Sequence, residues 1–127
     1  MPDDVRIRED LQIIQVDSHG DVTAENLKRS LEEVVRIHQK RGLSKVLVDA
    51  TKQRSLPDTV PVFQFGSELA EASRKLKFAI VSSRKTVAAQ KFLETAAVNR
   101  GACVQVFDSV DAALAWLLGK PNKPDAG

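Results

Sequence analysis

Three short apolar runs, separated by longer stretches with helical periodicity, constrain the fold of this chain more than any other feature. The runs are Lys45–Asp49 (KVLVD), Lys77–Ser82 (KFAIVS) and Cys103–Phe107 (CVQVF). Such runs are typical of strands that are buried on both faces of a sheet. Strands that alternate with helices pair in parallel, through right-handed crossovers. The pattern therefore predicts a parallel sheet with helices over its faces.

Two strand-like segments at the N-terminus, Val5–Arg8 and Leu11–Val16, flank the turn residues Glu9 and Asp10 and predict an antiparallel hairpin. We expect an α/β fold with a mixed sheet of about five strands, the hairpin followed by parallel strands, and four helices. Apolar spacing, caps and glycine stops indicate the helices. The first is expected from the N-cap Thr23 to about Arg41, before Gly42, the second from about Thr59 to Ser73, and the third from about Thr86 to Arg100. The fourth is expected to begin after the N-cap Ser109, with an inner face formed by Val110, Ala113, Leu114 and Leu117.

The length and composition are those of one domain. Of the 127 residues, 43% are hydrophobic, which is enough for a core, and we place the domain at residues 1–118. Residues 119–127 (GKPNKPDAG) lack large apolar side chains and are expected to form a flexible tail. One cysteine, no signal-peptide pattern and no apolar run of about 20 residues favour a cytoplasmic protein without stable membrane insertion.

Charge and histidine content argue against several partners. The chain has 19 Lys plus Arg against 17 Asp plus Glu, and few aromatic residues, so we expect no nucleic-acid partner. Its two histidines, His19 and His38, lie 19 positions apart without cysteine pairs, and we expect no metal and no other cofactor. His19 is expected in the turn before the first helix. His38 is expected to pack on the apolar face of that helix, with Leu27, Leu31 and Val34.

Residues 11–118 resemble STAS domains and the SpoIIAA-like family, which shares its fold with STAS and CRAL-TRIO domains. The likeness to STAS domains rests on residues 11–49, where a strand leads through a Gly-Asp-Val-Thr turn into a helix and then into a strand that ends in Asp49. The likeness to the SpoIIAA-like family rests on FAIVSS, on a helix that ends in Asn-Arg-Gly, and on VQVFDSVDAALAWL. The resemblance implies a binding module that is not an enzyme.

Two kinds of binding follow from the resemblance. We expect a SpoIIAA/STAS-like module that binds or carries a small apolar or amphipathic ligand, as the SpoIIAA-like branch and CRAL-TRIO domains imply. The alternative is a regulatory protein–protein interaction domain of the anti-sigma-factor-antagonist type. The Asp-Ser-Ser-Gly-like segment of the phosphorylated antagonists is absent, because residues 54–59 read RSLPDT. Ser55 and Thr59 are the nearest hydroxyls and are weak candidates for phosphorylation.

The turn Ser82-Ser83-Arg84-Lys85-Thr86 follows a parallel strand and precedes a helix. Ligands gather at that edge of open α/β sheets, and the free N–H groups of a helix N-terminus attract anions. Two interpretations stay open. The turn is either a solvated, well-capped helix start, or it holds the anionic end of a ligand or an acidic partner surface.

The segment from Leu56 to Leu69 is punctuated by proline and glycine, and Phe63 points away from its apolar stripe. An exposed Phe forgoes roughly 1.5–3 kcal/mol of burial. Phe63 is therefore expected to contact a neighbouring helix, the second subunit of a homodimer, or an apolar ligand beneath this segment. The ligand-binding hypothesis comprises Leu56, Val60, Phe63, Ser82, Ser83, Arg84, Lys85 and Thr86.

Three further expectations concern single positions. Cys103 is expected to be a small buried hydrophobe of the last strand. Asp49 lacks the acidic pair and the lysine that a phosphate-accepting receiver needs, so it is expected to end its strand or to accept loop N–H groups. In the helix over residues 86–100, Val87 and Val98 are expected to be exposed, as idle surface or as a self-association patch, while Ala89, Phe92 and Ala96 face the sheet.

Overall fold

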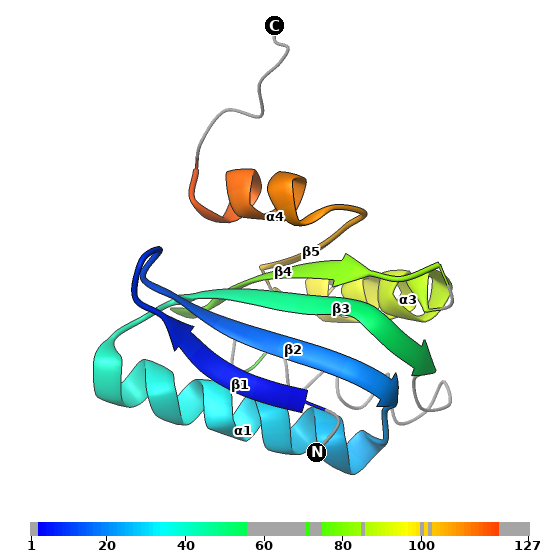
Figure 1. Cartoon of the computed structure of the whole chain (residues 1–127), viewed down its shortest axis with the longest axis horizontal. Helices are drawn as coiled ribbons and strands as arrows, with labels where there is room; N and C mark the ends of the chain where they lie inside the picture. The colour runs from blue at the N-terminus through cyan, green and yellow to red at the C-terminus, as the bar shows by residue number, and fades with distance from the viewer. Residues whose placement is uncertain are drawn as a thin grey trace, which may run out of the picture.

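The computed structural model describes residues 3–55, 71, 75–84, 86–99, 101 and 103–119, and the structural statements below concern these residues. They form a sheet with helices packed on both faces (Figure 1). The elements are β1 (Asp3–Arg8), β2 (Ile13–Asp21), α1 (Ala24–Arg41), β3 (Lys45–Ser55), β4 (Lys77–Ser82), α3 (Val87–Val98), β5 (Val104–Phe107) and α4 (Val110–Leu117).

The five strands form one sheet in the order β1-β2-β3-β4-β5. β1 pairs antiparallel with β2, with Val5 opposite Val16. The remaining neighbours pair in parallel, for example Val46 with Phe78 between β3 and β4. The predicted mixed α/β sheet is therefore confirmed. Three of the four expected helices lie in the described residues. Of the helix expected over residues 59–73, the structure describes only Glu71, which is helical.

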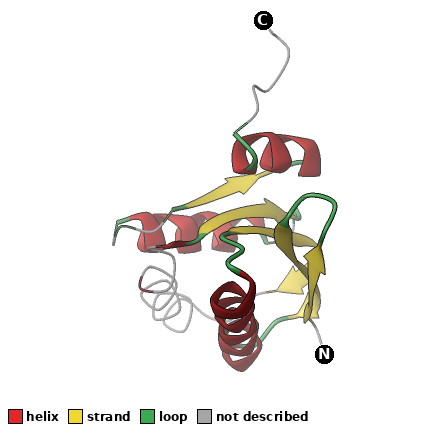
Figure 2. Ribbon diagram, turned by 90° about the vertical axis from the view of Figure 1, so that its left-hand side faces the viewer, coloured by secondary structure: helices red, strands yellow, loops and turns green. Residues whose placement is uncertain are grey.

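Each face of the sheet has its own apolar core. Because side chains alternate along a strand, Val46 and Leu47 belong to opposite cores. The larger core lies under α1 and α3, and the smaller lies under α4, which covers the opposite face (Figure 2). This division into two cores means that a cavity on the α1 and α3 side is separated from α4 by the sheet.

α1 begins and ends where the sequence predicts. The Thr23 hydroxyl accepts from the Asn26 N–H, and the Asn26 side chain accepts from the Thr23 N–H, which forms a capping box. Gly42 adopts φ 71° and donates to the His38 carbonyl oxygen at 2.9 Å, a left-handed C-terminal stop. His38 is half-buried, with Nδ1 2.8 Å from the Leu43 carbonyl oxygen. His38 thus lies half-buried near the end of α1, and its ring contacts the backbone of Leu43.

β2 and β3 are longer than predicted. β2 was expected to end at Val16 and β3 at Asp49, but they run on to Asp21 and Ser55. His19 therefore lies in β2, not in a turn. The extensions are polar, so they lack the apolar signal of a strand while their backbones still pair with each other. Asp21 holds their ends together by accepting from Arg54 and from the Ser55 hydroxyl.

The predicted burials of Phe92, Cys103 and Val110 are wrong, and that of Ala89 holds only in part. Phe92 is 40% exposed and Ala89 is half-buried, because α3 turns Gln90, Leu93 and Ala97 to the sheet instead, although Ala96 is buried as expected. Cys103 is exposed, because β5 begins one residue after it. Val110 is exposed at the first position of α4, where it has not yet reached the core. The expected exposure of Val87 and Val98 is confirmed.

The described helices and side chains show two further features. Within the ranges given above, none of the helices has the length and apolarity needed to cross a membrane. In the same part of the chain, metal-ligating side chains nowhere gather in groups of three or more.

In the hairpin turn, the hydrogen bond from Arg8 to Asp10 lowers the pKa of the Asp10 carboxyl and raises the pKa of the Arg8 guanidinium.

Candidate functional site

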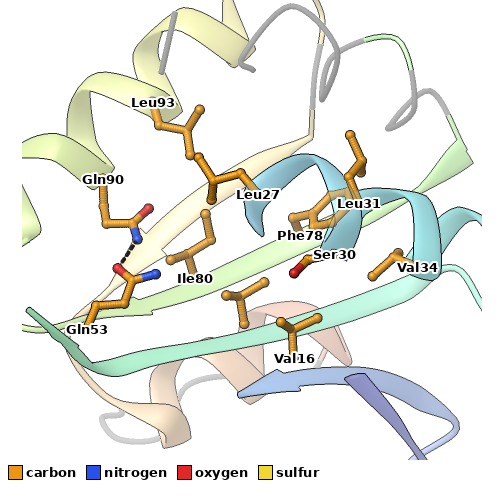
Figure 3. A pocket seen from close by; sticks show the side chains of 11 residues that line it. Val16, Leu27, Ser30, Leu31, Val34, Gln53, Phe78, Ile80, Gln90 and Leu93 are labelled. Carbon is orange, nitrogen blue, oxygen red and sulfur yellow. Dashed lines mark hydrogen bonds between the residues drawn. The ribbon is translucent and has the colours of Figure 1, made fainter. Parts of the chain in front are cut away.

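A small apolar cavity with a volume of about 60 Å³ lies between α1, α3 and the sheet and is partly open to solvent. Figure 3 shows the side chains that line it. The described residues that line it carry no ionisable side chain. Eight of them are apolar, and the three polar ones are a serine and two glutamines. The lining is Val16, Leu27, Ser30, Leu31, Val34, Val48, Gln53, Phe78, Ile80, Gln90 and Leu93.

The periodicities of helix and strand bring these apolar side chains together. Leu27, Leu31 and Val34 follow the i, i+4, i+7 spacing of α1 and form the stripe that faces the sheet. Phe78 and Ile80 alternate along β4 and face the same side. The cavity is thus the place where the stripe of α1, the inner face of α3 and the sheet fail to close completely.

An irregularity in β3 turns Gln53 toward this cavity. Asp17 pairs with Asp49, but His19 pairs with Lys52, so β3 contains one residue more than β2 between these pairs. This is a β-bulge, and it reverses which residues of the strand face the cavity. The Asp49 carboxylate stabilises it by accepting from the Thr51 N–H at 3.1 Å and from the Thr51 hydroxyl at 2.6 Å. Asp49 therefore does not end the strand, and the N–H that it accepts from belongs to β3 itself and not, as had been expected, to a loop.

Gln53 is the centre of a buried polar network at one end of the cavity. Its Nε2 donates to the Ser18 hydroxyl at 2.9 Å, and its Oε1 accepts from Nε2 of Gln90 at 2.8 Å (Figure 3). Its backbone carbonyl accepts from the Ser83 hydroxyl at 3.2 Å. Both glutamines are 3% exposed. Among the described residues, Oε1 of Gln90 has no hydrogen-bond partner.

The turn over residues 82–86 supports this network. The hydroxyls of Ser83 and Thr86 are 3.0 Å apart, and the Thr86 N–H donates to the Ser83 carbonyl oxygen at 3.3 Å. Thr86 is buried, Ser82 and Ser83 are half-buried, and Arg84 is exposed. The two inner hydroxyls are thus bonded within the protein. None of these four described residues lines the cavity.

Several expected site residues lie outside the described part of the chain: Leu56, Thr59, Val60, Phe63 and Lys85. Ser55 is described and exposed, and its hydroxyl donates to the Asp21 carboxylate at 2.9 Å. A phosphate on Ser55 would be placed against that negative charge, which disfavours a phosphorylation switch at this position.

Sequence reasoning missed Gln53 and Gln90. Gln90 shares a stripe with Leu93 and Ala97, at i, i+3 and i+7 of α3. A polar residue on an apolar stripe was therefore the signal available in the sequence. Gln53 offered no comparable signal, because its orientation depends on the bulge between Asp49 and Lys52.

Comparison with known proteins bears on the fold and on the family. The family model described as SpoIIAA-like matches residues 13–118. Among solved structures, the chain is similar to an uncharacterized protein from the DUF3478 family with a SpoIIAA-like fold from Shewanella loihica PV-4. The identity is 15%, the match covers 91% of each chain, and the TM-score is 0.57. None of the curated proteins matches this chain.

Proposed function

The chain belongs to the SpoIIAA-like family, and from that premise we propose that it binds a small apolar or amphipathic molecule in the cavity between α1, α3 and the sheet, without chemically changing it. The observation that carries the proposal is the lining itself, which is apolar, partly open and free of ionisable side chains among the described residues. Such a lining favours binding by burial of apolar surface. The described part of the lining holds no acid or base that catalysis would use.

The size of the cavity limits what it accommodates. A volume of about 60 Å³ is well below the roughly 150 Å³ of an engineered apolar cavity that binds benzene. The cavity therefore accepts a short alkyl end or part of a small ring, and a longer ligand extends through the open side. Each buried methylene contributes about 0.8 kcal/mol, so affinity depends on how many carbons enter.

A series of straight-chain alcohols from ethanol to 1-hexanol tests the proposal. We expect the dissociation constant to fall by about fourfold per methylene, the factor that corresponds to ~0.8 kcal/mol, until the cavity is filled. NMR titration of the full chain measures it through saturable shifts of the Leu27, Val34 and Leu93 amides. Saturable shifts confined to other residues, or no saturation at all, would overturn the proposal.

A substitution at the edge of the cavity provides a matched test. Leu31→Phe places a larger side chain into the cavity, and we expect it to weaken 1-butanol binding by about tenfold, the loss of nearly two buried methylenes. Leu114→Phe is the control, because Leu114 is also half-buried but lies on α4 and packs against the smaller core on the opposite face of the sheet. Equal weakening by both variants would show that the alcohol binds elsewhere.

The interaction-domain alternative predicts a different set of results. The cavity would bind no alcohol, and a protein partner recovered by pull-down would be lost on changing the exposed Arg84 to Glu. Saturable alcohol binding at the α1 and α3 residues, unaffected by Arg84→Glu, favours the small-molecule function.

A further inference from the structure

We infer that the molecule bound in this cavity carries a neutral hydrogen-bond donor, such as an alcohol hydroxyl or an N–H, and that this donor pairs with Oε1 of Gln90. The inference rests on the proposed function and specifies the chemical class of its ligand. It differs from the anionic end that was one of the two interpretations of the turn over residues 82–86.

The hydrogen bonds of the Gln90 amide lead to this inference. Its Nε2 donates to Gln53 at 2.8 Å, while its Oε1 is buried and unpaired among the described residues. In Figure 3 this oxygen is on the side of the amide that faces Leu27 and Leu93, which line the same cavity. A buried acceptor without a partner is costly, and a donor supplied by a ligand removes that cost. Among the described residues of the lining, this oxygen is thus the buried polar atom that lacks a hydrogen-bond donor, and a ligand is able to supply one.

The network ties the orientation of the Gln90 amide to that of the Gln53 amide. Turning the Gln90 amide alone would place its oxygen against Oε1 of Gln53, because Nε2 of Gln53 already donates to Ser18. Gln53 is itself held by the bulge and by the bond from Ser83 to its carbonyl oxygen. The acceptor is therefore presented on a rigid support, which is what specific recognition of a donor requires.

The described residues of the lining carry no charge that would balance an ionised ligand. A carboxylate or phosphate would bring its oxygens against the Gln90 oxygen. An ammonium group would donate to that oxygen, but the described lining has no acidic side chain to balance its charge. Burying an unpaired charge is far more costly than burying a hydroxyl. A neutral alcohol, phenol or N–H compound with an apolar body fits both the lining and the free acceptor.

The test compares 1-butanol with its isomer methyl propyl ether, which has the same atoms but no donor. Dissociation constants are measured by NMR titration on the unaltered chain and on the double variant Gln53→Met with Gln90→Met. The double variant removes the Gln90 acceptor together with Oε1 of Gln53, which would otherwise lose its donor and become a second free acceptor in the lining. We expect the preference for the alcohol over the ether to fall by about five- to tenfold in the double variant, as for loss of one neutral hydrogen bond. Gln15→Met is the control, since Gln15 is buried on β2 but does not line the cavity.

The outcomes separate this inference from the proposed function. An unchanged preference in the double variant, with both compounds still bound, overturns the donor inference and leaves the binding function standing. The same result is expected if both amides are reversed, because Gln90 would then present an N–H to the cavity. The alcohol and the ether would both accept from that N–H. Absence of binding by both compounds overturns the proposed function.

A measurement on the unaltered chain does not depend on the variant folding. The side-chain carbonyl carbon of Gln90 should move downfield with 1-butanol and not with methyl propyl ether, because only the alcohol donates to that carbonyl. Equal movement with both compounds would overturn the inference.

Discussion

Leu117→Ala is expected to lower the free energy of unfolding by about 2–5 kcal/mol, the range for removing a buried leucine side chain. Leu117 is fully buried in the smaller core, against β3 and β4. α4 has only eight residues, so it depends on this packing more than on its own helix propensity. Urea denaturation followed by circular dichroism measures the loss. Leu114→Ala, at a half-buried position of the same helix, should cost distinctly less.

The same variant tests whether the two faces of the sheet are independent. Lys77 keeps a second attachment to α4, because Nζ donates to the Trp116 carbonyl oxygen at 2.8 Å and lies 4.3 Å from the centre of the Trp116 ring. α4 should therefore stay docked in Leu117→Ala at low urea. The affinity of the folded variant for 1-butanol should equal that of the unaltered chain. A large change in affinity would show that the smaller core shapes the cavity across the sheet.

Gln53→Met is expected to lower the free energy of unfolding by about 2–4 kcal/mol, because it removes the acceptor of Gln90 and leaves that buried amide unpaired at both ends. It also removes the hydrogen bond to Ser18. The bond from Ser83 should survive, since it goes to the backbone of Gln53. Equilibrium urea denaturation measures the effect.

The double variant Gln53→Met with Gln90→Met identifies the cause. Replacing both partners of a buried polar pair by apolar groups of similar shape is close to neutral, so we expect the double variant to be more stable than Gln53→Met alone. Gln105→Met, at an exposed position of β5, is the control and should stay within about 0.5 kcal/mol of the unaltered chain. A double variant that is less stable than Gln53→Met would show that packing, and not the unpaired amide, sets the cost.

The candidate site was only partly predictable. The sequence indicated the edge of the sheet where the turn over residues 82–86 lies, and that turn does contact the polar network through Ser83. It did not indicate that the hydroxyls of Ser83 and Thr86 bond within the protein. A sequence shows which groups are able to bond, but which partners they meet depends on segments far apart in the chain, here Ser83 and Gln53.

By itself the sequence determined the order of strands and helices, the antiparallel hairpin before parallel strands, and the two ends of α1 at Thr23 and Gly42. These are consequences of local physics: apolar periodicity, the capping hydroxyl and the left-handed conformation that glycine adopts at little cost. Only the tertiary structure decided the rotation of α3, which exposes Phe92 and buries Gln90, and the bulge that turns Gln53 to the same cavity. Both depend on how one element packs on another. A small rotation of a helix, or a shift of a strand by one residue, changes which side chains are buried, although the local sequence pattern stays the same.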